Sequence, residues 1–448
     1  MMALKREKKM SHAQTMAVGF FMIIAIGTLL LTLPISSRSG EWTNPLSALF
    51  TATSATCVTG LVVVDTYQYW TLFGQIVIIA MIQIGGLGFI TISVLFSMFL
   101  KKNIGLEKRN LIQESVSSLQ LSGVVKLVRK IVKGTIILEG TGAILLAIRF
   151  VPRMGLVVGL YNAVFHSISA FCNAGFDLMG RYQTYSSLTD YYGDPIVNIT
   201  IMALIVLGGI GFIVWDDVYR NRLHVKRYSL HTKIVLIATT ILIFGGALLF
   251  GIFEHNNLMK GMNPVETVLS SLFASVTTRT AGFNTIDLGT MTQPSKLLTV
   301  VLMFIGGSPG STAGGIKTTT IVVIIMYIWS NLRNASGCNI MGRRIGDENI
   351  KNASMVLGLN LGLAITALLI ISSVQLIPLD NLMLEVFSAI GTVGLSTGVT
   401  RDLNVVSQIV IIFLMYCGRI GSMTFALSLT YKKQNVPVQY PEERINVG

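Results

Sequence analysis

Eight long apolar runs constrain what this 448-residue chain can fold into. Each is long enough to cross a bilayer, which takes about 20 residues of helix. Only 12% of the residues are charged and 52% are hydrophobic. So few charged residues cannot cover the surface of a water-soluble protein of this size. The sequence therefore predicts an all-α polytopic membrane protein. The predicted spans are residues 16–33, 71–100, 134–151, 196–215, 234–253, 297–329, 353–378 and 405–431.

The net charge is +13, and the basic residues are distributed between the predicted spans in a regular way. Basic residues gather before the first span and after each even-numbered span, so the positive-inside rule predicts that both termini lie in the cytoplasm. A charge distributed in this way predicts no nucleic-acid partner. The basic loops suit either anionic membrane lipids or a docked subunit. The basic stretches are residues 5–9, 101–133, 220–233, 333–351 and 432–444.

A shorter apolar segment follows each odd-numbered span. These segments are too short to cross and are predicted to be re-entrant pore helices. Each is followed by a glycine, and the four glycines recur about 110 residues apart, which indicates a unit made four times. The segments are residues 46–58, 158–172, 264–276 and 382–390, and the glycines are Gly60, Gly175, Gly282 and Gly394.

A second glycine-rich marker lies in each even-numbered span, at residues 85–89, 208–212, 306–310 and 418–422. One such stretch alone is typical of close helix packing. Two markers in register, four times over, predict four helix, pore-loop, helix repeats in a pseudo-fourfold arrangement around one central pore. The predicted repeats are residues 1–110, 111–226, 227–350 and 351–448, the last with a cytoplasmic tail.

The pore loops predict a selectivity filter. Non-helical backbone at membrane depth is tolerated only where it is buried in protein or lines an aqueous path. Glycine lets backbone carbonyls crowd one axis, where they can replace the water around a cation. The loops are mostly neutral, which favours a monovalent cation over a divalent site built from carboxylates. The predicted filter residues are Val58, Thr59, Gly60, Asn173, Ala174, Gly175, Thr280, Ala281, Gly282, Thr392, Val393 and Gly394.

Two carboxylates stand five residues beyond filter glycines, Asp65 in the first repeat and Asp287 in the third. These repeats would face each other across the pore, so the pair is predicted to flank its outer mouth and concentrate cations. A solvated loop acid or a helix N-cap stays open as the alternative at both positions.

The fourth repeat carries Arg419 where the others carry Gly86, Gly209 and Gly307. A permanent cation inside a membrane span is costly and indicates a function. If this position faces the axis, the guanidinium would repel passing cations below the filter. An arginine packed against backbone carbonyls for structural reasons is the alternative.

The third repeat predicts a gate. Residues 297–329 would form a helix of about 50 Å against about 30 Å of hydrocarbon, so this span is expected to break or tilt. Its glycines and proline disfavour continuous helix and predict an intramembrane loop directly below the filter. The predicted gate, besides Arg419, is Gly306, Gly307, Ser308, Pro309, Gly310, Ser311, Thr312, Ala313, Gly314 and Gly315.

Nucleotide binding and catalysis are not expected of this chain. A Walker A loop needs lysine directly after glycine, whereas Ile316 separates Gly315 from Lys317. Paired catalytic carboxylates and hydrolase motifs are absent, so the chain is not predicted to be an enzyme. Glu139, Arg279 and His166 are expected to be structural: a paired carboxyl, a brace behind the filter and a satisfied buried histidine.

The fourfold unit also carries a family resemblance. The Thr-Gly-Leu-Val-Val-Val-Asp-Thr run at 59–66, Gly-Gly-Leu-Gly-Phe at 85–89 and Gly-Arg-Ile-Gly at 418–421 resemble the Trk/Ktr/HKT superfamily of potassium transporters. The resemblance covers essentially the whole chain. It is closest to the short, eight-span membrane subunits of bacterial Ktr systems, of the KtrB or KtrD type.

This resemblance implies potassium uptake through one pore per subunit in a bacterial cell membrane. It also implies assembly as a homodimer, activation by Na+, and regulation by a cytoplasmic ring of nucleotide-binding RCK subunits of the KtrA or KtrC type. The family's filter glycines fall on the four glycines above, its gating loop on residues 306–315 and its pore-barrier arginine on Arg419. The alternative is an alternating-access cation carrier, although parallel repeats favour a pore.

Overall fold

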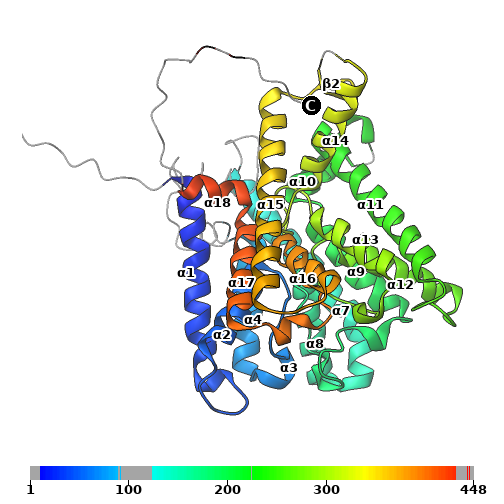
Figure 1. Ribbon diagram of the computed structural model, residues 1–448. Coiled ribbons are helices and arrows are strands. Elements are labelled where there is room, and N and C mark those ends of the chain that lie inside the picture. Colours follow the sequence, from blue (N-terminus) through cyan, green and yellow to red (C-terminus); the bar gives the residue numbers. More distant parts are fainter. Residues whose placement is uncertain are drawn as a thin grey trace, which may run out of the picture.

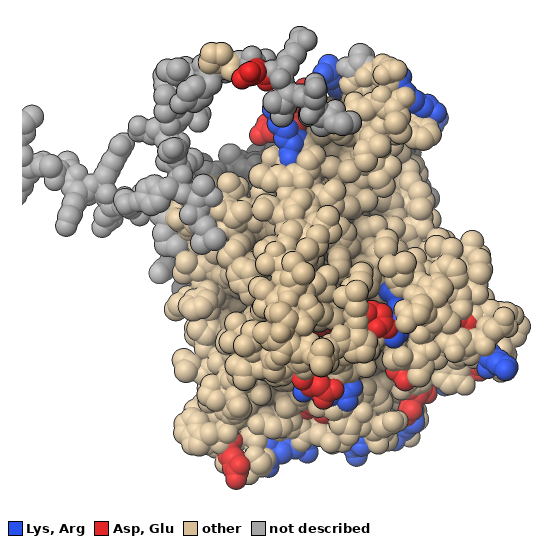
Figure 2. Space-filling model, in the orientation of Figure 1, with Lys and Arg blue, Asp and Glu red and all other residues tan. Residues whose placement is uncertain are grey.

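The computed structural model describes residues 11–88, 91, 124–222, 224–335, 337–429, 441 and 443. These residues are mainly helical, and α1, α17 and α15 lie side by side along the height of the molecule (Figure 1). Charged side chains gather toward the two ends, and a broad band between them is largely free of charge (Figure 2). A surface of this kind suits a protein embedded in a bilayer.

Four long helices pass as membrane spans by length and composition among the described residues. They contain most or all of the predicted spans 16–33, 134–151, 234–253 and 353–378, so these four predictions are confirmed as apolar helices. Capping at Ser11 and Ser229 fixes where two of them begin, because each hydroxyl accepts a backbone N–H three residues on. The four are α1 (His12–Thr32), α7 (Val124–Met154), α11 (Leu230–Glu254) and α15 (Asp347–Val374).

Two predicted spans are wrong as continuous helices. In place of 196–215, α9 (Pro195–Gly209) and α10 (Phe212–Asn221) meet at 96°. In place of 405–431, α17 (Val405–Ile420) and α18 (Ser422–Leu429) meet at 98°. The breaks fall at Gly211 (φ +98°) and Gly421 (φ +94°), in the left-handed region that only glycine adopts without strain.

The remaining even-numbered spans are α4 and the pair α13 and α14. Helix α4 (Leu72–Leu87) forms the first part of 71–100, and nearly all of that span beyond Gly88 lies outside the described residues. The predicted break in 297–329 is confirmed, because α13 (Gln293–Phe304) and α14 (Thr318–Leu332) are joined by the non-helical residues 305–317. The basic stretches 5–9 and most of 101–133 and 432–444 also lie outside the described residues.

The four short apolar segments form short helices, each packed against the long helix that precedes it. Their entry points are marked locally: Asn44 and Asn263 cap two of them through side-chain oxygens, each followed by a proline at the first helical position. Part of their apolar side chains is buried, mainly toward the C-terminal ends that lead into the glycine loops. The short helices are α2 (Pro45–Cys57), α8 (Leu156–Phe171), α12 (Pro264–Thr277) and α16 (Leu379–Gly391).

The remaining elements are short and lie in the connections. Antiparallel strands β1 and β2 form a hairpin at the same end of the molecule as α14's C-terminus (Figure 1). These elements are α3 (Thr66–Tyr69), η1 (Pro34–Ser36), η2 (Met179–Arg181), η3 (Thr189–Tyr191), η4 (Val225–Arg227), η5 (Leu288–Thr290), η6 (Val399–Asp402), β1 (Asn339–Ile340) and β2 (Arg343–Arg344).

An ion pair between α13 and α16 supports a stability prediction. The Lys296 ammonium, on a residue only 8% exposed, lies 2.8 Å from Asp380 Oδ2. The hydrogen bond from Lys296 lowers the pKa of the Asp380 carboxyl. A carboxyl whose pKa is lower in the folded state stabilises the fold above its unfolded pKa of about 3.9, and this contribution is lost as the pH falls through the folded pKa.

Replacing Asp380 by asparagine is therefore expected to lower the free energy of unfolding by about 1–2 kcal/mol at pH 7, because Lys296 loses its ionic partner. Thermal unfolding of detergent-solubilised protein would measure the loss, and the difference from wild type should shrink below about pH 4. Asp287→Asn is the matched control, since Asp287 is exposed and accepts one hydrogen bond from its own turn. Equal effects of the two substitutions at pH 7 would contradict the prediction.

Candidate functional site: a ring of glycine loops between two cavities

The four filter glycines meet in one closed ring. All four have left-handed backbone: φ is +96° at Gly60, +69° at Gly175, +80° at Gly282 and +91° at Gly394. Each lies so close to the next loop that a Cβ would overlap a carbonyl oxygen there. These distances are 2.5 Å from Gly60 to Ala174, 2.7 Å from Gly175 to Ala281, 2.6 Å from Gly282 to Val393 and 2.1 Å from Gly394 to Thr59.

The residues before each glycine repeat the same strained backbone. Two positions earlier stand Val58, Asn173, Thr280 and Thr392, and all four have positive φ although none is glycine. Non-glycine residues held in this region cost about 1–3 kcal/mol each and cluster at functional sites. The structure thus brings all twelve predicted filter residues together, and each loop has positive φ at the same two positions.

Short-helix hydroxyls brace two of these loops. Ser54 Oγ accepts the Gly60 N–H at 3.1 Å, and Ser388 Oγ accepts the Gly394 N–H at 3.0 Å. In the other two repeats the hydroxyl reaches beyond the glycine instead, since Ser169 donates to the Phe176 carbonyl and Thr277 to the Phe283 carbonyl. Hydroxyls in the last turns of these helices therefore fix the loops without charged side chains.

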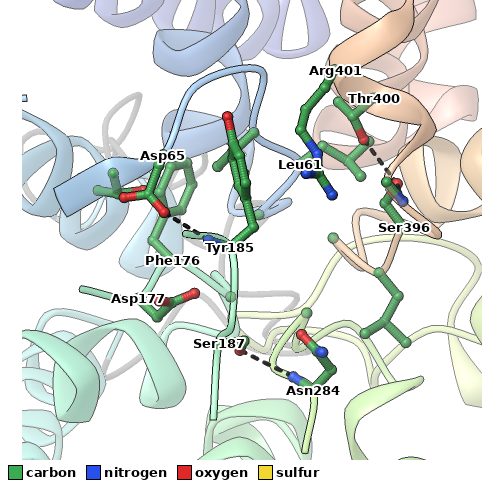
Figure 3. A pocket seen from close by; sticks show the side chains of 18 residues that line it. Leu61, Asp65, Phe176, Asp177, Tyr185, Ser187, Asn284, Ser396, Thr400 and Arg401 are labelled. Atoms are coloured by element: carbon green, nitrogen blue, oxygen red, sulfur yellow. Dashed lines mark hydrogen bonds between the residues drawn. The ribbon is translucent and has the colours of Figure 1, made fainter. Parts of the chain in front are cut away.

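A cavity of about 90 Å³ lies on one side of the ring (Figure 3). All four loops line it through their glycines. Asp177 also lines it, and burial raises the pKa of this carboxyl to about 7, although a hydrogen bond from the Met179 N–H opposes the shift. We call this space the outer cavity.

The predicted pair of mouth carboxylates is not arranged symmetrically. Asp65 lines the outer cavity, but it is 7% exposed and accepts the N–H groups of Tyr67, Gln68 and Tyr185 at 2.9 Å each. Asp287 is exposed, accepts the Gly289 N–H and is not among the residues lining this cavity. Both carboxylates cap short helices, which was the alternative left open.

A second cavity, of about 280 Å³, lies where the glycine markers of the even-numbered helices meet, and we call it the inner cavity. Gly86, Gly418 and Arg419 line it, together with Gly310, Ser311, Ala313 and Gly315 of the predicted gate. The predicted gate loop and the predicted barrier arginine therefore share one cavity.

Arg419 joins two repeats through backbone carbonyls. Its guanidinium donates to the carbonyls of Thr312 in the gate loop and of Gly85, and to that of Gly86 at 3.0 Å. The arginine lines the inner cavity and also packs against backbone carbonyls, which was the alternative left open. Its role as a barrier stays a prediction.

The gate loop is held by the other repeats and by one lysine. Ser308 and Thr312 donate backbone N–H bonds to Gly209 and Gly208, at 3.0 and 3.2 Å. The Lys317 ammonium donates to the carbonyls of Ala313 at 2.8 Å and Gly314 at 3.3 Å. No role was predicted for Lys317. The signal in the sequence was a lysine two residues after the last glycine of this stretch.

The three residues expected to be structural are buried or partly buried, and only His166 has both of its polar side-chain atoms partnered. Glu139 accepts a hydrogen bond from Gln83 at 3.3 Å. His166 is fully buried, with its ring nitrogens 2.8 Å from the Asn162 carbonyl and 3.4 Å from the Leu178 N–H. Arg279 is 5% exposed and donates to Thr239 at 3.4 Å.

Comparison with known proteins agrees with this architecture. The chain is 41% identical to the potassium/sodium uptake protein NtpJ of Enterococcus hirae over 98% of each chain. It is also 41% identical to the Ktr system potassium uptake protein B of Bacillus subtilis over 100% of each chain. The crystal structure of the potassium transporter TrkH from Vibrio parahaemolyticus superposes with a TM-score of 0.73 at 18% identity, over 96% of this chain and 87% of that one.

The structural likeness shows a shared fold, and the family match covers nearly the whole sequence. Residues 3–436 match the TrkH family, described as a cation transport protein. The resemblance found in the sequence is thereby confirmed, as is the prediction that the chain is not an enzyme, because the family and these relatives are membrane transporters. This chain belongs to the TrkH family of cation transport proteins.

Proposed function

We propose that this chain is the ion-translocating, channel-like subunit of a Ktr-type potassium uptake system in a bacterial cell membrane. One observation carries the proposal: four glycine loops close into a ring with a cavity on either side. Relatives along the full length of the chain are named for potassium uptake, which supports K+ as the ion.

In the proposed mechanism, backbone carbonyls of the twelve filter residues replace water around a dehydrating K+ ion. The strained loops and their hydroxyl braces hold these carbonyls in place before the ion arrives. Preorganised carbonyls avoid the cost of ordering them around each ion. We propose that the repeats 1–110, 111–226, 227–350 and 351–448 surround this single pore, with eight spans and four pore helices.

The gate in this proposal is the loop 306–315 with Arg419. The guanidinium supplies a fixed positive charge on the inner side of the filter, and its hydrogen bond to the Thr312 carbonyl couples that charge to the loop. Movement of the loop would remove the Thr312 carbonyl from Arg419 and so release the guanidinium from the ion pathway. In this mechanism Asp65 has a structural role, because it joins the first repeat to the second by accepting the Tyr185 N–H. Asp287 caps the N-terminus of η5.

We further propose a homodimer with both termini cytoplasmic, regulated by a KtrA- or KtrC-like ring of RCK subunits and activated by Na+. Support comes from the names of the relatives, which place them in a Ktr system. The exposed basic residues Arg343 and Arg344 on the β1–β2 hairpin offer a surface for such a ring or for anionic lipid. We propose that this chain itself binds no nucleotide.

A second candidate is an alternating-access cation carrier. The broken helix pairs α9–α10 and α17–α18 favour it, because carriers bind ions at helix breaks near the midplane. The two candidates differ in kinetics. A carrier accelerates tracer uptake when K+ is supplied on the opposite side, whereas an open pore does not.

The test is flux of K+ and Na+ into proteoliposomes that contain the purified chain, with protein-free vesicles as the control. We expect K+ entry above the protein-free rate, entry of Na+ at a lower rate, and no acceleration by K+ on the opposite side. No K+ entry in vesicles with folded protein would overturn the proposed function. Clear acceleration would favour the carrier.

A further inference from the structure

A segment of the second repeat crosses the outer cavity. The N–H of Tyr185 donates to Asp65 in the first repeat at 2.9 Å, and Ser187 Oγ accepts the N–H of Asn284 in the third repeat at 3.2 Å (Figure 3). The N–H of Leu188 also donates to the Asn284 carbonyl at 3.0 Å. Residues 185–188, which we call the strap, are therefore fixed at both ends by other repeats.

The strap is held in strained backbone. Tyr185 and Ser187 have φ of 60° and 48°, and neither is glycine. Two such residues this close together persist only where surrounding contacts determine them. In this conformation the Tyr185 ring contacts Arg401 in the fourth repeat.

That contact is a stack on Arg401. The guanidinium carbon lies 4.0 Å from the centre of the Tyr185 ring, and both side chains line the outer cavity (Figure 3). Arg401 comes from η6 and crosses above Gly398, where a Cβ would lie 2.8 Å from its terminal nitrogen. Repeats two and four thus meet above the glycine ring through a cation–π pair.

The charge of Arg401 is not neutralised by an ion pair. Across the ranges that the structure describes, no carboxylate lies within 4.0 Å of its guanidinium. Glu385, which is fully buried, accepts hydrogen bonds from Ser396 at 2.7 Å and Thr400 at 2.5 Å, and it interacts with Arg401 electrostatically without forming an ion pair. Asp65 already accepts three N–H groups. An exposed cation therefore stands at the outer mouth, where the sequence predicted only negative charge.

We propose that Arg401, held over the outer cavity by Tyr185, sets the rate at which cations enter this transporter. The inference rests on the proposed function and extends it to the outer mouth. A fixed positive charge lowers the local concentration of cations and slows their approach. Because the residue is exposed, salt in the outer solution should weaken this effect.

A charge series at position 401 tests the proposal. K+ uptake is measured in proteoliposomes over a range of outer K+ concentrations, with equal amounts of folded protein. Arg401→Gln is expected to raise uptake at low K+ by about two- to fivefold through a lower KM, with the maximal rate nearly unchanged. Arg401→Glu should exceed it, and Arg401→Lys, which keeps the charge, should resemble wild type.

Ionic strength and Tyr185 supply two further readouts. The difference between Arg401→Gln and wild type should fall when an impermeant salt is added outside. Tyr185→Phe retains the ring and should resemble wild type, whereas Tyr185→Leu frees the guanidinium and should give a KM between those of wild type and Arg401→Gln.

Two results overturn the inference. One is an unchanged KM in Arg401→Gln and Arg401→Glu. The other is an equal change in Arg401→Gln and Arg401→Lys, which would show that Arg401 only anchors the strap. Either result, in protein whose wild type passes K+, leaves the proposed function intact. A wild type that passes no K+ refutes the proposed function first.

Discussion

Replacing Arg419 by glutamine is expected to raise K+ flux in proteoliposomes by about tenfold or more. The substitution removes a fixed charge from the inner cavity, and a nearby unit charge at an effective dielectric constant of about 20 amounts to several kcal/mol. It also releases the carbonyls of Thr312, Gly85 and Gly86, so the gate loop loses its link to the first repeat. The loss of the charge and the release of the gate loop are both expected to raise K+ flux.

Arg333→Gln is the matched control for this experiment. Arg333 also is an arginine at the end of a helix, but it is exposed and stacks on Trp329, away from both cavities. It should leave flux at the wild-type level. Unchanged or reduced flux in folded Arg419→Gln protein would mean that the arginine is only a structural brace.

The preference for K+ over Na+ should fall by about tenfold or more when Gly60 is replaced by serine. Gly60 has φ of +96°, and a Cβ would lie 2.5 Å from the Ala174 carbonyl oxygen in the next loop. The serine can be accommodated only if one of the two loops moves, and carbonyls that move by tenths of an ångström no longer match one ion. The ratio of K+ to Na+ flux in proteoliposomes measures the change.

Gly40→Ser separates this effect from backbone strain. Gly40 also has positive φ, at +71°, but a Cβ there would meet no atom within 4 Å. The control variant therefore carries a similar conformational cost of about 1 kcal/mol without the overlap. An unchanged flux ratio in folded Gly60→Ser protein would contradict the placement of the filter at this ring.

Features carried by local patterns could be predicted from the sequence. Residues 46–58 were expected to form a short helix and Gly60 to end its loop, because apolar length and a repeated glycine are visible without the fold. The bend at Gly211 was missed, since a hydropathy window measures composition and is unaffected by a change of direction. In the fold, Gly211 approaches the Pro309 carbonyl of another repeat, a contact that no local pattern carries.

The charges at the outer mouth were predicted less well for the same reason. Asp65 and Asp287 occupy equivalent positions in the sequence, but only Asp65 meets the strap. Arg401 belongs to neither of the two repeated glycine motifs, so the sequence did not single it out. Its position over the outer cavity depends on its contact with Tyr185, more than two hundred residues away along the chain. Such partners become visible only when the four repeats are assembled.

The closure of the glycine ring also bears on how the protein is made. Gly394, in the fourth repeat, abuts the Thr59 carbonyl in the first. A nascent chain that has inserted three repeats therefore has an open arc of loops and no complete ring. In the proposed pore, ion-coordinating geometry would therefore require the fourth repeat, so a chain that stops after the third repeat could not leave a selective K+ leak in the membrane.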